Sequence, residues 1–131
     1  MITFKIGMVL HMDVPDAGID HLKYLVVLNQ DKIDPNVIGV CLINSELSNI
    51  TSKKKFQIEI LKKDYDFLDH DSYIDCGVVK KIKKDVMDDE YDKGKIKVIC
   101  YLNENDMNKV MNAGASNIAL SKRDRSFFTD I

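Results

Sequence analysis

The first residues of the chain alternate between hydrophobic and polar side chains. From Phe4 to Met12 every second position is apolar, and this two-residue period predicts a half-buried β-strand. Residues 13–20 contain Pro15, Gly18 and three aspartates, which predicts a surface loop after that strand. Short runs rich in β-branched and aromatic residues predict further strands at residues 21–28, 37–43, 56–60 and 72–76, and residues 78–82 are compatible with a sixth.

The hydrophobic period changes after residue 82. The expected elements are a helix over residues 83–91, a strand over 95–102, a helix over 104–113 and a short terminal helix from residue 121. Gly94 follows the first of these helices as a C-cap. Asn103 and Ser121 are of the residue types that accept a hydrogen bond from the first turn of a helix, so they predict where the last two helices begin.

This element order predicts a mainly β fold with C-terminal helices. The early strands are joined by short connections without helical segments, so a parallel sheet with crossover helices is disfavoured. Closing the strands into a small antiparallel β-barrel would remove the exposed sheet edges. We therefore expect residues 1–131 to form a single barrel domain with a helical segment over about residues 103–131.

Composition narrows the class of protein. The chain has 131 residues and a formal net charge of −2, which argues against coating nucleic acid by bulk attraction and leaves only local basic patches. Cys41, Cys76 and Cys100 are widely spaced in apolar runs, which predicts buried, reduced thiols. No apolar run approaches the roughly 18 residues of a membrane span, so we expect a cytoplasmic protein that does not bind membranes.

Charged residues occur in blocks of one sign. Residues 53–63 hold five Lys and one Glu, 64–75 hold five Asp, 80–84 hold four Lys, and 85–92 hold five acids. The simpler interpretation is that these blocks are solvated faces whose opposite charges pair. In the alternative interpretation, the two Lys blocks lie together and form a groove for a nucleic-acid backbone.

Residues suited to acid–base chemistry stand at the predicted strand ends. His21 and Lys23 open the second strand, Ser45 follows the third, and His70 and Ser72 lie where the fifth begins. Such ends meet at the rim of a barrel, where binding sites are common. An imidazole can exchange a proton, a lysine can stabilise charge on phosphorus, and a hydroxyl can orient an anionic oxygen. These groups suit RNA cleavage by the 2′-hydroxyl, without a metal or cofactor.

Each candidate also has a structural interpretation. His21 can simply flank the loop, His70 can hydrogen-bond the aspartates beside it, and Ser45 can be a turn residue. In another alternative, four residues bind a divalent metal ion; they are Asp69, His70, Asp71 and Asp75. Their spacing, however, fits no common metal-binding motif.

Three segments resemble the PemK/MazF-like toxin group; they are residues 5–10 with 21–28, residues 40–45, and residues 67–76. The last contains His70-Asp71-Ser72-Tyr73-Ile74, similar to an H-x-S-Y-(I/V) segment of these toxins, and a C-terminal helix extends the likeness over most of the chain. The resemblance implies an SH3-like barrel, usually a homodimer. It also implies cleavage of single-stranded mRNA by the toxin of a toxin–antitoxin pair, which a small antitoxin protein inhibits. The group's basic residue at the start of the second strand and its Ser or Thr at the end of the third correspond to Lys23 and Ser45.

The chain departs from the group in one respect. The group's basic residue is commonly Arg, whereas the only arginines here are Arg123 and Arg125 near the C-terminus. Lys23 supplies a point charge without the bidentate contact of a guanidinium. Three hypotheses follow. The protein is an RNA-cleaving toxin-like enzyme, or it is a catalytically inactive barrel of a phage or mobile element that binds protein or nucleic acid. In the third hypothesis it is a structural partner in a larger assembly that dimerises through its apolar first strand.

Overall fold

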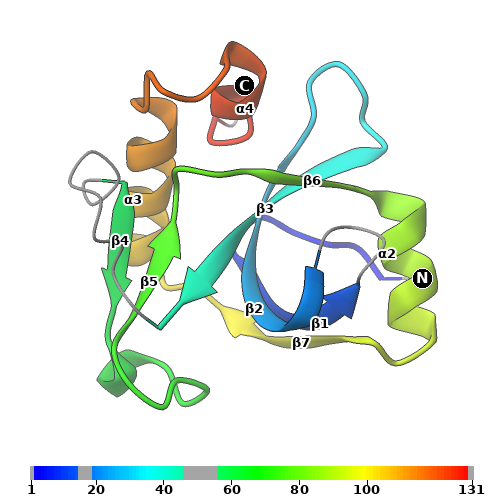
Figure 1. Cartoon of the computed structure of the whole chain (residues 1–131), viewed down its shortest axis with the longest axis horizontal. Helices are drawn as coiled ribbons and strands as arrows, with labels where there is room; N and C mark the ends of the chain where they lie inside the picture. The colour runs from blue at the N-terminus through cyan, green and yellow to red at the C-terminus, as the bar shows by residue number, and fades with distance from the viewer. Residues whose placement is uncertain (1, 15–18, 46–55, 130–131) are drawn as a thin grey trace.

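The computed structural model describes residues 2–14, 19–45 and 56–129 (Figure 1). Within these residues the strands are β1 (Met8–Val14), β2 (Ile19–Gln30), β3 (Val37–Asn44), β4 (Gln57–Ile60), β5 (Ser72–Asp75), β6 (Lys80–Lys83) and β7 (Ile96–Tyr101). The helices are α2 (Lys84–Asp92), α3 (Glu104–Ala115) and α4 (Lys122–Ser126), and a short 3-10 helix covers Lys62–Asp64. None of the helices in these ranges has the length and apolar character needed to cross a bilayer.

The strands of the described ranges pair antiparallel in the order β4-β5-β3-β2-β1-β7. One edge of β3 has two partners, because residues 37–40 pair with β6 and residues 43–44 pair with β5. The mainly β, antiparallel fold with C-terminal helices is confirmed.

The sheet is not closed, however, since no pairing within the described ranges joins β4 to β7. Helices take the place of that pairing. Helix α3 contacts β4, and α2 contacts both β6 and β7 at the far end of the molecule (Figure 1).

Most elements lie within two residues of the bounds that the hydrophobic pattern predicted, and the start of the first strand differs most. The first strand begins at Met8 rather than Phe4, because Gly7 has a φ of 87° and turns the chain just before the strand. The second strand begins at Ile19, inside the predicted loop. Both predicted N-caps are confirmed: the Asn103 side chain accepts a hydrogen bond from the Asp106 amide at 2.8 Å, and Ser121 accepts one from the Asp124 amide at 3.0 Å.

Side chains of the central strands alternate between two hydrophobic cores on opposite faces of the sheet. Val26 belongs to the first core, together with Val110 of α3 and the C-terminal Phe127 and Phe128. The second core instead contains the strand neighbours of Val26, and α2 covers it; its members include Leu25, Val27 and Met87. The helices therefore complete both cores of a sheet that does not close on itself.

Two glycines admit the C-terminal phenylalanines into the first core. A Cβ atom at Gly39 would lie 2.7 Å from the ring of Phe127, and one at Gly114 would lie 2.1 Å from the ring of Phe128. The C-terminal segment therefore packs directly against β3 and α3.

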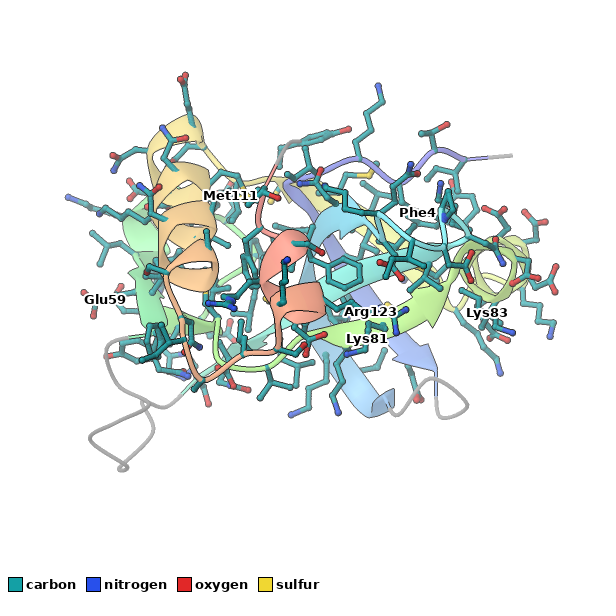
Figure 2. All side chains as sticks on the ribbon, turned by 90° about the horizontal axis from the view of Figure 1, so that it is seen from above. Phe4, Glu59, Lys81, Lys83, Met111 and Arg123 are labelled. Atoms are coloured by element: carbon teal, nitrogen blue, oxygen red, sulfur yellow. The ribbon has the colours of Figure 1, made fainter. Side chains whose placement is uncertain are left out.

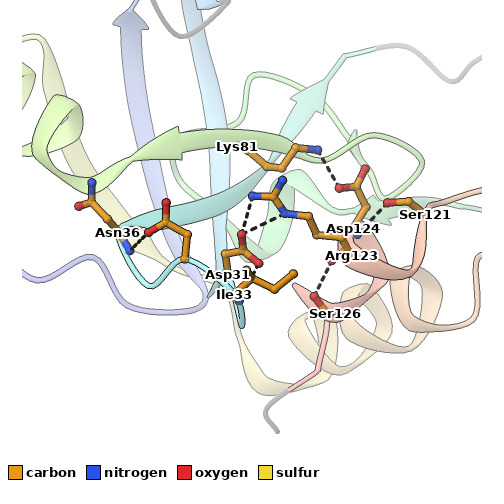
Figure 3. Close-up of polar contacts among 9 residues, drawn as sticks. Asp31, Ile33, Asn36, Lys81, Ser121, Arg123, Asp124 and Ser126 are labelled. Atoms are coloured by element: carbon orange, nitrogen blue, oxygen red, sulfur yellow. Dashed lines mark hydrogen bonds and ion pairs between the residues drawn. The ribbon is translucent and has the colours of Figure 1, made fainter.

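An ion pair between the buried Asp31 and the exposed Arg123 fastens the same segment to the connection between β2 and β3 (Figure 3). Asp31 is 1% exposed, and its carboxylate accepts hydrogen bonds from Nε of Arg123 at 3.0 Å and from Nη2 at 2.5 Å. The hydrogen bond from Arg123 lowers the pKa of Asp31 below its usual value. Lys81 of β6 pairs with Asp124 of α4 at 2.7 Å, and Figure 2 shows Lys81 beside Arg123 at this contact.

The three cysteines are free thiols. Cys41 and Cys76 are buried, as predicted, and Cys100 is half-buried. A hydrogen bond with Cys76, together with burial, raises the pKa of Cys41 well above its usual value, and burial raises the pKa of Cys100. These shifts favour the protonated, unreactive thiol.

Candidate active site at the ends of β2 and β3

Two adjoining cavities lie where β2 begins and β3 ends. The first, here called the Lys23 cavity, has a volume of about 430 Å³ and is lined by Leu22, Lys23, Tyr24, Ile43, Asn44 and Ser45. The second, the His70 cavity, has a volume of about 110 Å³; it shares Tyr24, Ile43, Asn44 and Ser45 with the first and adds residues that include Phe67, His70 and Ser72. Four of the five residues predicted from the sequence therefore line one continuous region.

Strand register brings these residues together. Tyr24 of β2 lies opposite Ile43 of β3, so the start of one strand adjoins the end of the other, and Ser45 follows directly. Lys23 is half-buried, and its ammonium group forms no hydrogen bond or ion pair with any described residue. The ammonium group of Lys23 and the hydroxyl of Ser45, which has no hydrogen-bond partner among the described residues either, are suited to contact an anionic oxygen.

The segment that carries His70 is shaped by hydrogen bonds at its two ends. The hydroxyl of Ser72, at 4% exposure, donates to the His70 carbonyl at 3.0 Å. The Asp71 carboxylate accepts from the Lys62 amide at 2.8 Å. Ser72 therefore holds the His70 backbone in place rather than facing the cavity as a free group. The His70 ring is exposed and forms no hydrogen bond with a described residue.

His21 is the fifth candidate. Its backbone lies in β2, two residues before Lys23, but its side chain lies outside what the structure describes. Its place in the site therefore stays a prediction.

A row of aromatic side chains supports the site, and the sequence analysis did not identify it. Tyr24 stacks on His11 of β1 with ring centroids 4.3 Å apart, and its ring lies 4.7 Å from that of Phe67. Phe67 in turn contacts Tyr65 at 5.9 Å, so the row joins β1 to the His70 segment. The alternation of the first strand placed His11 on its polar face, but nothing in the sequence indicates which ring lies beside it.

Helix α3 fixes the far end of this aromatic row. The hydroxyl of Tyr65 donates to the Asp106 carboxylate at 2.6 Å and accepts from the Asn103 amide at 3.1 Å. Burial, and then the hydrogen bond to Asp106, raise the pKa of Tyr65 well above its usual value. The row is therefore held at neutral pH by an uncharged phenol bonded to a carboxylate.

Two of the acidic residues near His70, Asp71 and Asp75, have separate protein partners. Asp75 accepts from Nε2 of Gln57 at 2.8 Å and from the Gly77 amide at 2.8 Å, while Asp71 bonds to the Lys62 amide. Across the described ranges, no group of three or more His, Cys, Asp or Glu side chains is arranged to hold a metal ion.

The structure also shows what some lysines of the two Lys blocks contact. In the second block Lys81 pairs with Asp124, and Lys84 donates to Gln30 at 2.7 Å, so both fasten one part of the fold to another. Residues 53–55 of the first block lie outside the described ranges. A separate cavity of about 710 Å³, beside the N-terminal segment and the loop after β2, contains none of the predicted site residues.

Comparison with known proteins identifies the fold. Neither protein-family models nor curated protein sequences give a match. Among solved structures, the Mycobacterium tuberculosis toxin MazF-mt6 is similar over 87% of this chain and 98% of that chain, with a TM-score of 0.55 and 12% sequence identity. The chain has a MazF/PemK-like fold. This confirms the fold expected from the sequence resemblance, and an identity of 12% supports the fold alone.

Proposed function

We propose that this MazF-like protein is a toxin-like endoribonuclease that cleaves single-stranded mRNA without a metal ion. The observation that carries the proposal is the placing of Lys23, Ser45 and His70 around adjoining cavities of this fold. An ammonium group, a hydroxyl and an imidazole are a sufficient set for attack by a ribose 2′-hydroxyl on the neighbouring phosphorus.

The reaction needs one proton removed and one supplied. A base takes the proton of the 2′-hydroxyl, the O2′–P bond forms, and the P–O5′ bond breaks as an acid protonates O5′. The products are a 2′,3′-cyclic phosphate and a 5′-hydroxyl. Lys23 stabilises the charge on the phosphoryl oxygens, Ser45 orients one of them, and His70 exchanges a proton. The Ser72 hydroxyl positions His70 by its hydrogen bond to the His70 carbonyl. His21 is a second candidate for proton exchange.

A cleavage assay tests this proposal. The purified protein is incubated with a long single-stranded RNA in the presence of EDTA, and the new 5′-hydroxyl ends are quantified. We expect cleavage by the wild type, a rate loss of about 10²–10⁴-fold for His70→Ala or His21→Ala, and a loss of about 10²-fold for Lys23→Gln. Lys122→Gln removes one exposed charge of α4 and serves as the matched control. An inactive wild type, or full activity in all three site variants, would refute the proposal.

The proposed partners are an antitoxin protein and a second copy of this chain, in the cytoplasm. Among the described strands, β7 lies at an edge of the sheet and exposes Val98, Ile99 and Tyr101, and such an edge is suited to contact another chain. Light scattering of the purified protein tests the homodimer. Co-expression with the product of a short neighbouring reading frame tests the antitoxin, which should co-purify and suppress RNA cleavage.

Binding of RNA or protein without catalysis, by the same fold, is the second candidate function. The observation that favours it is the absence of arginine from the residues that line the two cavities. Arg123 is committed to Asp31 and cannot substitute. RNA binding with equally inert wild type and variants would support this function instead.

A further inference from the structure

The cavity of about 710 Å³ lies at the opposite end of β2 from the candidate active site. Its lining includes Gln30 at the end of β2 and Pro35 in the turn before β3, whereas Lys23 lies near the start of β2. At about 3.3 Å per residue, roughly 20 Å of strand separate Lys23 from Gln30. We call this space the Lys5 cavity. It shares no residue with the Lys23 cavity or the His70 cavity.

Backbone hydrogen bonds bring three segments of the chain together around the Lys5 cavity. The Gly7 amide donates to the Val27 carbonyl at 2.8 Å, so the N-terminal segment runs beside the end of β2. The Lys84 amide donates to the Asn36 carbonyl at 2.7 Å, which holds the start of α2 against the β2–β3 turn. Figure 1 shows the N-terminal segment and α2 at the same end of the molecule. Three lysines that are distant in the sequence therefore line one cavity; they are Lys5, Lys32 and Lys84.

The charges of these three lysines are not balanced by carboxylates. Nζ of Lys5 forms no hydrogen bond or ion pair with any described residue. Nζ of Lys32 donates to the Thr129 carbonyl at 2.8 Å, and Nζ of Lys84 donates to Oε1 of Gln30 at 2.7 Å. Both acceptors are uncharged. Because an ammonium group has three N–H donors, each of these bonds orients a lysine and leaves two donors for a ligand.

Asp31 is the one carboxylate among the residues that line the cavity, and its partners lie within the protein. One oxygen accepts both bonds from Arg123, and the other accepts from the Ile33 amide at 3.2 Å. Asp34 and Asp85 accept hydrogen bonds from amides of their own turns and do not line the cavity. The lining therefore carries a net positive charge.

The cavity also offers a ring and two amide groups. Phe4 is half-buried, and its ring is held edge-to-face against Tyr91 of α2 with centroids 6.4 Å apart. Oδ1 of Asn29 and Nε2 of Gln30 have no partner among the described residues. An aromatic ring can stack on a nucleobase, and a free amide can bond to a base edge or a ribose hydroxyl.

We propose that the Lys5 cavity binds a free nucleoside di- or triphosphate, at a site separate from the candidate active site. The three lysines bind the phosphates, and the base lies against Phe4. An RNA chain carries one charge per nucleotide, whereas three ammonium groups around one cavity match the adjacent phosphates of a polyphosphate. The volume lies within the usual range for small-ligand sites. The proposal does not depend on the nuclease function, because the two sites have no residue in common.

Isothermal titration calorimetry of the full chain tests the proposal. ATP, inorganic tripolyphosphate and adenosine are titrated separately in the presence of EDTA. We expect saturable binding of ATP at one site, with a dissociation constant in the micromolar range. Tripolyphosphate should bind about 10-fold more weakly because it has no base to stack, and adenosine, which has no phosphate, should bind more weakly than ATP.

Two variants separate the contribution of charge from that of the ring. Lys5→Gln should weaken ATP and tripolyphosphate alike, by about 10-fold, because it removes one charged donor. Phe4→Leu should weaken ATP by about 10-fold and leave tripolyphosphate unchanged. Thermal melts verify that both variants are folded. The Lys5 side chain has no partner in the described structure, so Lys5→Gln decides the site even if Phe4→Leu does not fold.

Control variants locate the binding site. Lys122→Gln on α4 removes one exposed charge elsewhere and should bind ATP as the wild type does. Lys23→Gln should do the same, because Lys23 lies at the other end of β2. ATP binding that is lost in Lys23→Gln and kept in Lys5→Gln would place the ligand in the candidate active site and overturn the proposal.

Three other results would also overturn it. They are a wild type that gives no saturable ATP binding, equal affinities for ATP and tripolyphosphate, which indicate a simple polyanion site, and a single-stranded RNA nonamer that displaces ATP and depends more strongly on Lys5. A protein that binds ATP through Lys5 and Phe4 but cleaves no RNA would support this site and refute the nuclease.

Discussion

Gly114 is the position where the addition of a single methyl group should disturb the fold most directly. A Cβ atom there would lie 2.1–2.3 Å from three carbon atoms of the Phe128 ring. Carbon atoms pack at roughly 3.5 Å, so the ring would have to move by more than 1 Å. Phe128 is 2% exposed within the first core, so a movement of its ring would disturb the packing of its core neighbours.

The expected cost of Gly114→Ala follows from two opposing effects. Overpacking of a core costs about 1–3 kcal/mol, and expulsion of the ring would cost about 3–5 kcal/mol. Replacing glycine by alanine inside a helix returns at most about 1 kcal/mol, and less here because Gly114 is next to the end of α3. We expect a net destabilisation of about 2 kcal/mol, which corresponds to a fall in Tm of roughly 5–10 °C.

Thermal and urea unfolding followed by circular dichroism measure this effect. Asn112→Ala, at an exposed position of the same helix, reports the gain in helix propensity alone and should leave Tm unchanged or slightly raised. Gly114→Ala should lose its destabilising effect in a Phe128→Ala background, where the ring is absent. The reasoning is refuted if Gly114→Ala melts at or above the wild-type temperature, or costs the same in both backgrounds.

Three further changes test the polar contacts that hold the site and the C-terminus. Tyr65→Phe should cost about 1–3 kcal/mol at pH 7, because it leaves the buried Asp106 carboxylate without its hydroxyl donor. Its difference from the wild type in urea unfolding should shrink above pH 10, since the folded-state pKa of Tyr65 is raised and the unfolded phenol ionises first. Arg123→Gln should lower stability at pH 7. That loss should diminish below pH 3.8 as Asp31, whose folded-state pKa is lowered by Arg123, becomes protonated, and unfolding at pH 7 and pH 3 gives the comparison. Asn103→Ala should cost about 1 kcal/mol in thermal unfolding by removing the N-cap of α3.

The candidate site could be predicted only in part. Strand-end positions directed attention to Lys23, Ser45 and His70, and these residues do line adjoining cavities. The sequence did not indicate that the Ser72 hydroxyl is turned to the His70 carbonyl, or that His11 stacks on Tyr24. The first contact depends on the local course of the backbone between His70 and Ser72, and the second depends on which strands are neighbours; a hydrophobic period carries no information about either.

The order of residues along the chain is enough to predict the local elements of this protein. Alternation, helical spacing and capping residues such as Asn103 and Ser121 act within a few neighbouring residues, so β1–β7 and the helices α2, α3 and α4 lie close to their predicted places. Three arrangements emerge only in the folded chain: β3 shares one edge between β5 and β6, α2 and α3 lie against the strands at the open edges, and Lys97 lies opposite His11. These arrangements depend on the packing free energy of both cores together. That free energy comes from contacts between residues far apart in the chain, so no single segment of the sequence reveals it.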